Sequence, residues 1–118
     1  MGVYFSVVGV PVPKQSFRYD GNGRGHTDER VEAWQHLVRV AAKAAMIGFE
    51  PIQGRVKVEL VFGLPDRVRR DVDNLSKGVL DACRKIVFVD DTQVVDLHVV
   101  KHVTPGSPGV SVLVTDVD

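Results

Sequence analysis

Cysteine is almost absent from this sequence, in which Cys83 stands alone among 118 residues. A single cysteine excludes an internal disulfide and is typical of a reducing compartment, so we expect a cytoplasmic protein. Long apolar runs are missing too, because no stretch approaches the roughly 20 residues that cross a bilayer. The first ten residues show no pattern of an export signal. We therefore expect neither a membrane partner nor secretion.

An excess of charge is also lacking, since 15 basic and 15 acidic residues give a formal net charge of zero. A dedicated nucleic-acid binder usually carries a clear basic excess. The basic residues are nevertheless segregated. One group is Arg67, Arg69, Arg70, Lys77, Arg84 and Lys85, and the other is Lys14, Arg18, Arg24 and Arg30. Local clusters of this kind can bind phosphates even in a neutral chain.

Hydrophobic periodicity predicts four strands and two helices. The strands are expected at residues 4–10, 55–64, 94–103 and 110–115. One helix is expected over residues 27–48, and the other over the apolar stripe Leu75, Val79, Ala82, Cys83 and Ile86. The turn residues 104–109 predict that the last two strands pair as a hairpin. This length and order predict one α+β domain over residues 1–118, with two helices on one face of a small mixed four-stranded sheet.

The stretch from Lys14 to His26 contains Gly21, Gly23 and Gly25 and almost no apolar periodicity. We interpret it as a mobile basic loop of about a dozen residues. The glycines match no dinucleotide or phosphate-loop fingerprint, so a nucleotide site is not indicated.

The chemically informative segments are residues 66–77, DRVRRDVDNLSK, and residues 89–96, VDDTQVVD. Asp71 and Asp73 are two residues apart at the start of the second expected helix, and in extended backbone such residues project to the same side. Lys77 follows one helical turn after Asp73. Asp90 and Asp91 come in the loop after the helix. The pattern indicates a polar site on the solvent side of this helix.

Carboxylates that converge need a cation. Two of them about 4 Å apart repel by roughly 4 kcal/mol at an effective dielectric of 20, a large share of a total stability of about 5–15 kcal/mol. Hard oxygen ligands without a nearby His and Cys set favour Mg²⁺ or Mn²⁺. Such an ion supports phosphodiester hydrolysis, and Lys77 could neutralise charge on the phosphate.

Each acid also has a purely structural interpretation. Asp73 could be a helix N-cap, Asp71 could pair with Arg69 or Arg70, and the Asp90–Asp91 pair could be a polar turn before a strand. Four acids and a lysine around one amphipathic helix favour the metal site over these separate roles.

Residues 69–101, which contain R-D-x-D-N-x-x-K followed by D-D-x-Q-V, resemble the signature of RusA-type Holliday junction resolvases. The opening strand, the sequence PVPKQ at residues 11–15 and the basic loop resemble the start of the same family, so the resemblance spans essentially the whole chain. It implies a Mg²⁺-dependent endodeoxyribonuclease that cuts four-way junctions by paired symmetric hydrolysis. It also implies a homodimer with two active sites.

By motif position, the resemblance implies that Asp71, Asp73 and Asp91 bind Mg²⁺, for which Mn²⁺ can substitute, and that Lys77 is catalytic. It gives Asp90 a secondary role. Recognition of branched DNA would rest on backbone contacts and DNA shape. The candidate phosphate ligands are Lys14, Arg18, Arg24, Arg67, Arg69 and Arg70.

Two other functions remain open. The chain could be another metal-dependent nuclease that cuts flaps or single strands, or a non-catalytic DNA-binding module whose aspartates are structural. For the expected two-fold interface, the candidate residues are Val61, Leu80, Val94 and Val100.

Overall fold

The computed structural model describes residues 1–14, 18–19, 25–26 and 29–117. A four-stranded sheet is built from β1 (Gly2–Val8), β4 (Val56–Leu64), β5 (Val94–Val103) and β6 (Gly109–Asp116). The strand order is β1-β6-β4-β5. β4 and β5 are parallel, whereas β6 is antiparallel to both β4 and β1, so the sheet is mixed as predicted.

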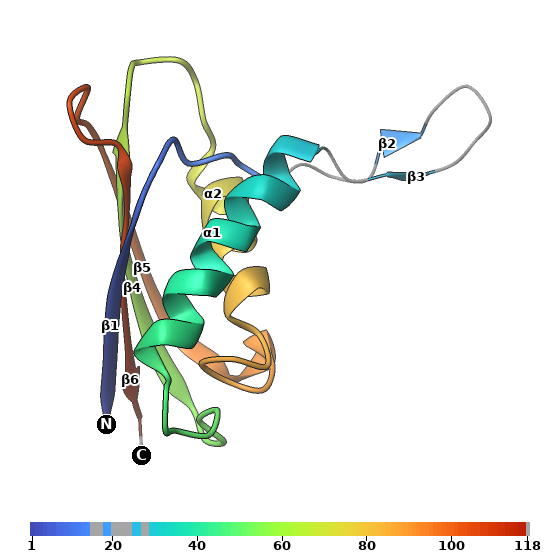
Figure 1. Ribbon diagram of the computed structural model, residues 1–118, viewed down its shortest axis with the longest axis vertical. Helices are drawn as coiled ribbons and strands as arrows, with labels where there is room; N and C mark the ends of the chain where they lie inside the picture. Colours follow the sequence, from blue (N-terminus) through green and yellow to red (C-terminus); the bar gives the residue numbers. More distant parts are fainter. Residues whose placement is uncertain (15–17, 20–24, 27–28, 118) are drawn as a thin grey trace.

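The two long helices, α1 (Glu29–Ala45) and α2 (Val72–Cys83), lie together on one face of the sheet (Figure 1). This arrangement confirms the predicted α+β class. Neither of these helices is long and apolar enough to cross a membrane, nor is any other helix in the described part of the chain.

The core lies between the helices and the inner face of the sheet. Strand alternation supplies one side of it, where the buried residues of β4 are Val56, Val58, Leu60, Phe62 and Leu64. The predicted helical stripes supply the other side, with Trp34 2% exposed and Cys83 1% exposed. Both residues are therefore core residues, as their positions in apolar stripes indicated.

The predicted hairpin between the last two strands is wrong. β4 lies between β5 and β6, and the segment between these two strands crosses over the end of β4. The amide of Thr104 donates to the carbonyl of Leu64 at 2.7 Å. A Cβ on Gly63 would lie 2.4 Å from Thr104 Oγ1, so only glycine leaves room for this crossing. The turn residues correctly indicated a reversal of direction, but not which strand fills the space between.

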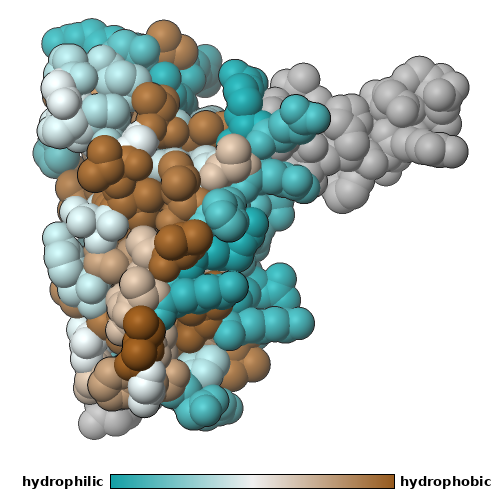
Figure 2. Space-filling view, in the orientation of Figure 1, coloured by the Kyte–Doolittle hydropathy of each residue, from teal (hydrophilic) through white to brown (hydrophobic). Residues whose placement is uncertain are grey.

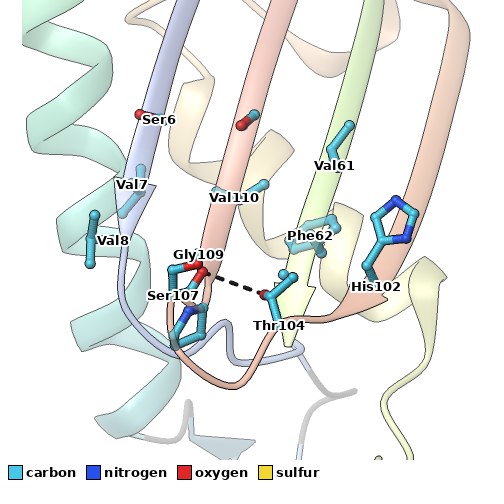
Figure 3. A pocket seen from close by; sticks show the side chains of 13 residues that line it. Ser6, Val7, Val8, Val61, Phe62, His102, Thr104, Ser107, Gly109 and Val110 are labelled. Carbon is cyan, nitrogen blue, oxygen red and sulfur yellow. Dashed lines mark hydrogen bonds between the residues drawn. The ribbon is translucent and has the colours of Figure 1, made fainter. Parts of the chain in front are cut away.

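The crossing segment borders a hollow of about 280 Å³ on the outer face of the sheet (Figure 3). Gly109 and Val61 line it, and Thr104 donates a hydrogen bond to the carbonyl of Ser107 at 3.4 Å on its rim. This face of the sheet is the one that the two helices leave uncovered (Figure 1).

The second helix ends earlier than its apolar stripe indicated. α2 stops at Cys83, the amide of Arg84 donates to the carbonyl of Asp81, and Lys85 adopts a positive φ of 67°. Ile86 therefore lies in the turn after α2, although it still packs against the core.

The expected basic loop contains two short strands, β2 (Arg18–Tyr19) and β3 (Gly25–His26), which pair antiparallel. The prediction of a loop without regular structure is wrong at these four residues. Gly21 and Gly23 lie outside the described residues.

Surface hydropathy differs between the two sides of the view in Figure 2. Apolar surface gathers over β1 and the adjoining side of α1, where Val8, Leu37 and Val40 are exposed. Polar surface covers the side of the helices that faces away from the sheet.

Candidate active site

Asp71 and Asp73 lie at the N-terminus of α2, immediately after the segment that leaves β4. Asp71 is the N-cap residue, and its Oδ1 accepts a hydrogen bond from the amide of Asp73 at 3.0 Å. The other oxygen of Asp71 and both carboxylate oxygens of Asp73 make no hydrogen bond with the described residues, and both side chains are exposed. Two carboxylates are therefore presented to solvent at one helix end, where the helix dipole favours negative charge.

Lys77 lies one helical turn after Asp73 and is exposed. Residues four apart are neighbours on a helix surface. The ammonium group forms no ion pair with the described residues, so it is available to an anion that a cation holds beside the carboxylates.

The segment between β4 and α2 is braced by internal contacts. Arg70 Nη1 donates to Asp66 Oδ1 at 2.7 Å and to the carbonyl of Val68 at 3.2 Å. The hydrogen bond from Arg70 lowers the pKa of the Asp66 carboxyl, and the amide of Val68 lowers it further. Lys101 Nζ on β5 donates to the carbonyl of Arg70 at 2.6 Å. These contacts fix the backbone that leads into Asp71.

The six candidate phosphate ligands differ in exposure and in what their side chains contact. Arg67 and Arg69 are exposed and make no ion pair with described residues. Arg70 is held by Asp66, and Lys14 forms an ion pair with Asp81 of α2.

The remaining two candidates are Arg18 and Arg24. Arg18 is described only as part of β2, and Arg24 lies outside the described residues.

A basic hollow of about 250 Å³ lies beside the N-terminus of α2. Its walls include Arg30 at the start of α1, together with Arg69 and Arg70, and Pro11 and Pro13 form its apolar side. Arg30 belongs to the second basic group of the sequence but was not predicted as a phosphate ligand.

The second acidic motif forms a short 3₁₀ helix, η1 (Asp91–Gln93), just before β5. Asp90 is its N-cap and forms a capping box with Gln93. Hydrogen bonds from the hydroxyl and amide of Thr92 lower the pKa of Asp90, and Arg84 Nη2 lies 3.2 Å from Asp90 Oδ1. Asp91 is exposed, and its carboxylate contacts no partner among the described residues. The structural interpretation therefore holds for Asp90 but leaves Asp91 available.

Within a single chain, Asp91 lies apart from Asp71 and Asp73. α2 has 12 residues, so it is about 18 Å long. Asp71 caps its first turn, whereas Asp90 pairs with Arg84, the residue that caps its end. In Figure 1 the chain descends from the upper end of β4 through α2 and then through a loop to the lower start of β5. Within the described residues no three His, Cys, Asp or Glu side chains form a group that could hold a metal.

Comparison with known proteins gives the family. The protein-family model for endodeoxyribonuclease RusA matches residues 8–115 of this chain. The chain belongs to the RusA family.

Relatives of this RusA-family chain include crossover junction endodeoxyribonuclease RusA from Escherichia coli K12, which is 39% identical over 95 residues. The protein of the same name from Shigella sonnei is also 39% identical over 95 residues. The one from Enterobacteria phage 82 is 38% identical over 95 residues. Each alignment covers 78% of this chain and 78% of the relative.

Sequence reasoning missed the contacts that Gln93 and Arg84 make in this RusA-family chain. Both contact Asp90, and Gln93 also bonds to the segment before β4. A signal for Gln93 was present, because an acid followed three residues later by Gln is the pattern of a capping box. Arg84 gave no local signal, since its pairing with Asp90 depends on the turn that follows α2.

Proposed function

We propose that this chain is a structure-selective endodeoxyribonuclease that resolves four-way DNA junctions by paired symmetric hydrolysis. The observation that carries the proposal is the exposed pair Asp71 and Asp73 at one helix end, one turn before Lys77, in a RusA-family chain. The named relatives are crossover junction endodeoxyribonucleases, which supports the same substrate class. Because the proposed substrate is cellular DNA, we expect the chain to act in the cytoplasm.

Nucleases of this family depend on a divalent metal. We propose Mg²⁺, which Mn²⁺ can replace, because the donors are carboxylate oxygens without His or Cys. The proposed ligands are Asp71, Asp73 and Asp91. The bound ion would activate water and offset charge on the phosphate. Lys77 would neutralise charge that develops on the phosphate, and Arg67 and Arg69 would hold the DNA backbone.

The distance between the aspartates supports a homodimer, because Asp71 and Asp73 lie at the start of α2 and Asp91 lies beyond its end. β4 and β5 are parallel, so Asp71 lies near the end of β5, where Lys101 reaches Arg70, while Asp91 immediately precedes the start of β5. A two-fold axis across β5 would set this strand antiparallel to its copy. Asp91 of the partner subunit would then approach the end that carries Asp71 and Asp73. We propose that two chains complete each site in this way.

The surface of β5 supports such pairing. It is a sheet edge, and its burial pattern leaves apolar side chains exposed on both faces, as Val95, Leu97, Val100 and Val103 show at 41–52% exposed. A long apolar edge strand tends to pair with another strand.

Two of the four residues expected at the interface, Val61 and Val100, are exposed. Leu80 and Val94 instead pack partly against the core, so they contribute less to a contact between chains.

A comparison of DNA substrates tests the proposed function. With Mg²⁺, we expect a mobile four-way junction to be cut at least about tenfold faster than a linear duplex or a flap, a difference of ~1.4 kcal/mol. Equal rates would instead indicate a nuclease without junction selectivity. Binding without cleavage at any Mg²⁺ or Mn²⁺ concentration would indicate the non-catalytic module. Omission of the metal is the control, and it should abolish cleavage but not binding.

A further inference from the structure

The side chain of Gln93 makes three hydrogen bonds, one within its own turn and two to the segment before β4. Its Oε1 accepts from the amide of Asp90 at 2.8 Å. Its Nε2 donates to the carbonyls of Ile52 at 2.8 Å and Gly54 at 2.7 Å. A carboxamide has two N–H donors and one oxygen, so every polar atom of this side chain is engaged.

These bonds fasten the turn before β5 to the segment before β4. That segment is itself anchored, because Ile52 is buried and its amide donates to the carbonyl of Val87 at 2.8 Å. On the other side of Asp91, the carboxylate of Asp90 bonds to Thr92 and pairs with Arg84. The residues that flank Asp91 are thus held on both sides.

Asp91 differs from these neighbours, because its carboxylate is exposed and contacts no described residue. A turn that uses Asp90 and Gln93 for structure leaves Asp91 free to serve another purpose. This division explains why the motif contains two adjacent acids, one that caps and one that points to solvent.

We infer that Gln93 is a positioning residue, which fixes the backbone of η1 so that Asp91 is presented to the divalent cation of the site that two chains complete. The inference rests on the proposed function, in which Asp91 is a metal ligand. Asp90 acts with Gln93 as the cap of the same turn and does not bind the ion. Groups that orient a ligand typically change metal affinity by about 10–100-fold when they are removed.

Only a side-chain amide at this position can both accept from the backbone amide of Asp90 and donate to the carbonyls before β4. Glutamate would keep the length of Gln93 but place an acceptor against the carbonyls of Ile52 and Gly54, and methionine would keep the shape without any hydrogen bond. The test therefore compares Gln93→Met and Gln93→Glu with Gln53→Met. Gln53 is an exposed glutamine of the same neighbourhood, and none of the described residues bonds to its side chain.

The measurements are the Mg²⁺ dependence of junction cleavage, Mg²⁺ binding by calorimetry, and amide hydrogen exchange in the peptide that contains Asp91. For both Gln93 variants we expect the Mg²⁺ concentration at half-maximal rate to rise by about 10–100-fold. Calorimetric affinity should fall by the same factor, and exchange around Asp91 should accelerate. Saturating Mg²⁺ should restore most of the maximal rate, and junction binding without metal should stay at the parental level. Gln53→Met should behave as the parent in every measurement.

Asp91→Asn, measured in parallel, separates this inference from the proposed function. Parental cleavage by Asp91→Asn would reject Asp91 as a ligand and with it the proposed site. An inactive Asp91→Asn together with a parental Mg²⁺ dependence in Gln93→Met would reject only the positioning role. Should Gln93→Met fail to fold, Arg84→Gln loosens the same turn through Asp90 alone. It should raise the Mg²⁺ requirement in the same direction, and an unchanged requirement with faster exchange would overturn the inference.

Discussion

Asp71 has two tasks at the start of α2, since it caps the helix and offers a carboxylate oxygen to solvent. Asparagine caps a helix about as well as aspartate but carries no charge. We therefore expect Asp71→Asn to unfold at the parental temperature while junction cleavage falls by about 100-fold or more, because a metal contributes several kcal/mol to such a reaction. Thermal unfolding and single-turnover cleavage measure the two effects.

Asp71→Ala is the matched control for the cap. It should lose activity to the same degree and also lose about 1 kcal/mol of unfolding free energy, because alanine does not accept the hydrogen bond from Asp73. Cleavage by Asp71→Asn at the parental rate would contradict the assignment of Asp71 to the metal.

The thiol of Cys83 is expected to be inert in the native protein. Burial raises its pKa to about 12, and only the thiolate reacts with alkylating agents. Iodoacetamide at pH 8 should leave the native chain unmodified and alkylate it completely in denaturant, as mass spectrometry can show. Rapid native alkylation would mean that the end of α2 opens frequently.

At the residue scale, the sequence indicated where the acids of the two motifs stand, but not which residues they contact. The motif lies at the start of a helix as predicted, but the cap that was considered for Asp73 as a structural alternative is formed by Asp71. An ion pair of Asp71 with Arg69 or Arg70 was the other structural alternative, and Arg70 instead pairs with Asp66. The pairing of Lys14 with Asp81 joins residues far apart in the chain, so it depends on how the elements pack and leaves no local pattern.

At the scale of elements, the path of the chain from β5 to β6 depends on small residues. A Cβ on Gly109 would lie 2.2 Å from the carbonyl oxygen of Val7 on the neighbouring strand. Backbone cannot move aside cheaply, so Gly109→Ala should lower the unfolding free energy by about 1–3 kcal/mol in urea. Gly106→Ala is the control, because nothing lies within 4 Å of its Cβ position. Equal stability of the two variants would contradict the packing described.

Strand bounds were predicted to within two residues, because runs of strand-forming residues are a local signal. Residues 94–103 were predicted without error, whereas the first strand covers residues 2–8 and not 4–10. The strand order could not be, because it is set by the crossover through α2, which makes β5 the parallel neighbour of β4. The end of α2 was missed for a similar reason. Ile86 keeps its apolar contacts after the chain turns at Lys85, so periodicity alone did not reveal the break.

At the scale of the whole molecule, the proposed shared site depends on contact between two β5 edges. Val100 is 45% exposed on β5, and a lysine there would place a charge in the proposed interface. We expect Val100→Lys to give the mass of a monomer by light scattering at micromolar concentration and to lose cleavage. Val8→Lys is the control, because Val8 is 85% exposed on the opposite edge strand. Val8→Lys should remain dimeric. A dimeric and active Val100→Lys variant would show that the interface does not include the middle of β5.

The location of Asp71 and Asp91 at opposite ends of α2 makes a mixed dimer the sharpest test of the shared site. One chain carries Asp71→Asn and the other Asp91→Asn, and two different affinity tags isolate dimers that contain one of each. If sites are shared between chains, one of the two sites carries both substitutions and the other carries none. If each site belongs to one chain, both sites are defective.

The decisive measurement is therefore junction cleavage by these mixed dimers, with the two singly substituted homodimers as inactive references. If the sites are shared, we expect mixed dimers to nick one strand per junction at the parental rate per intact site, about half of the parental total. Mixed dimers as inactive as both homodimers would contradict the shared site.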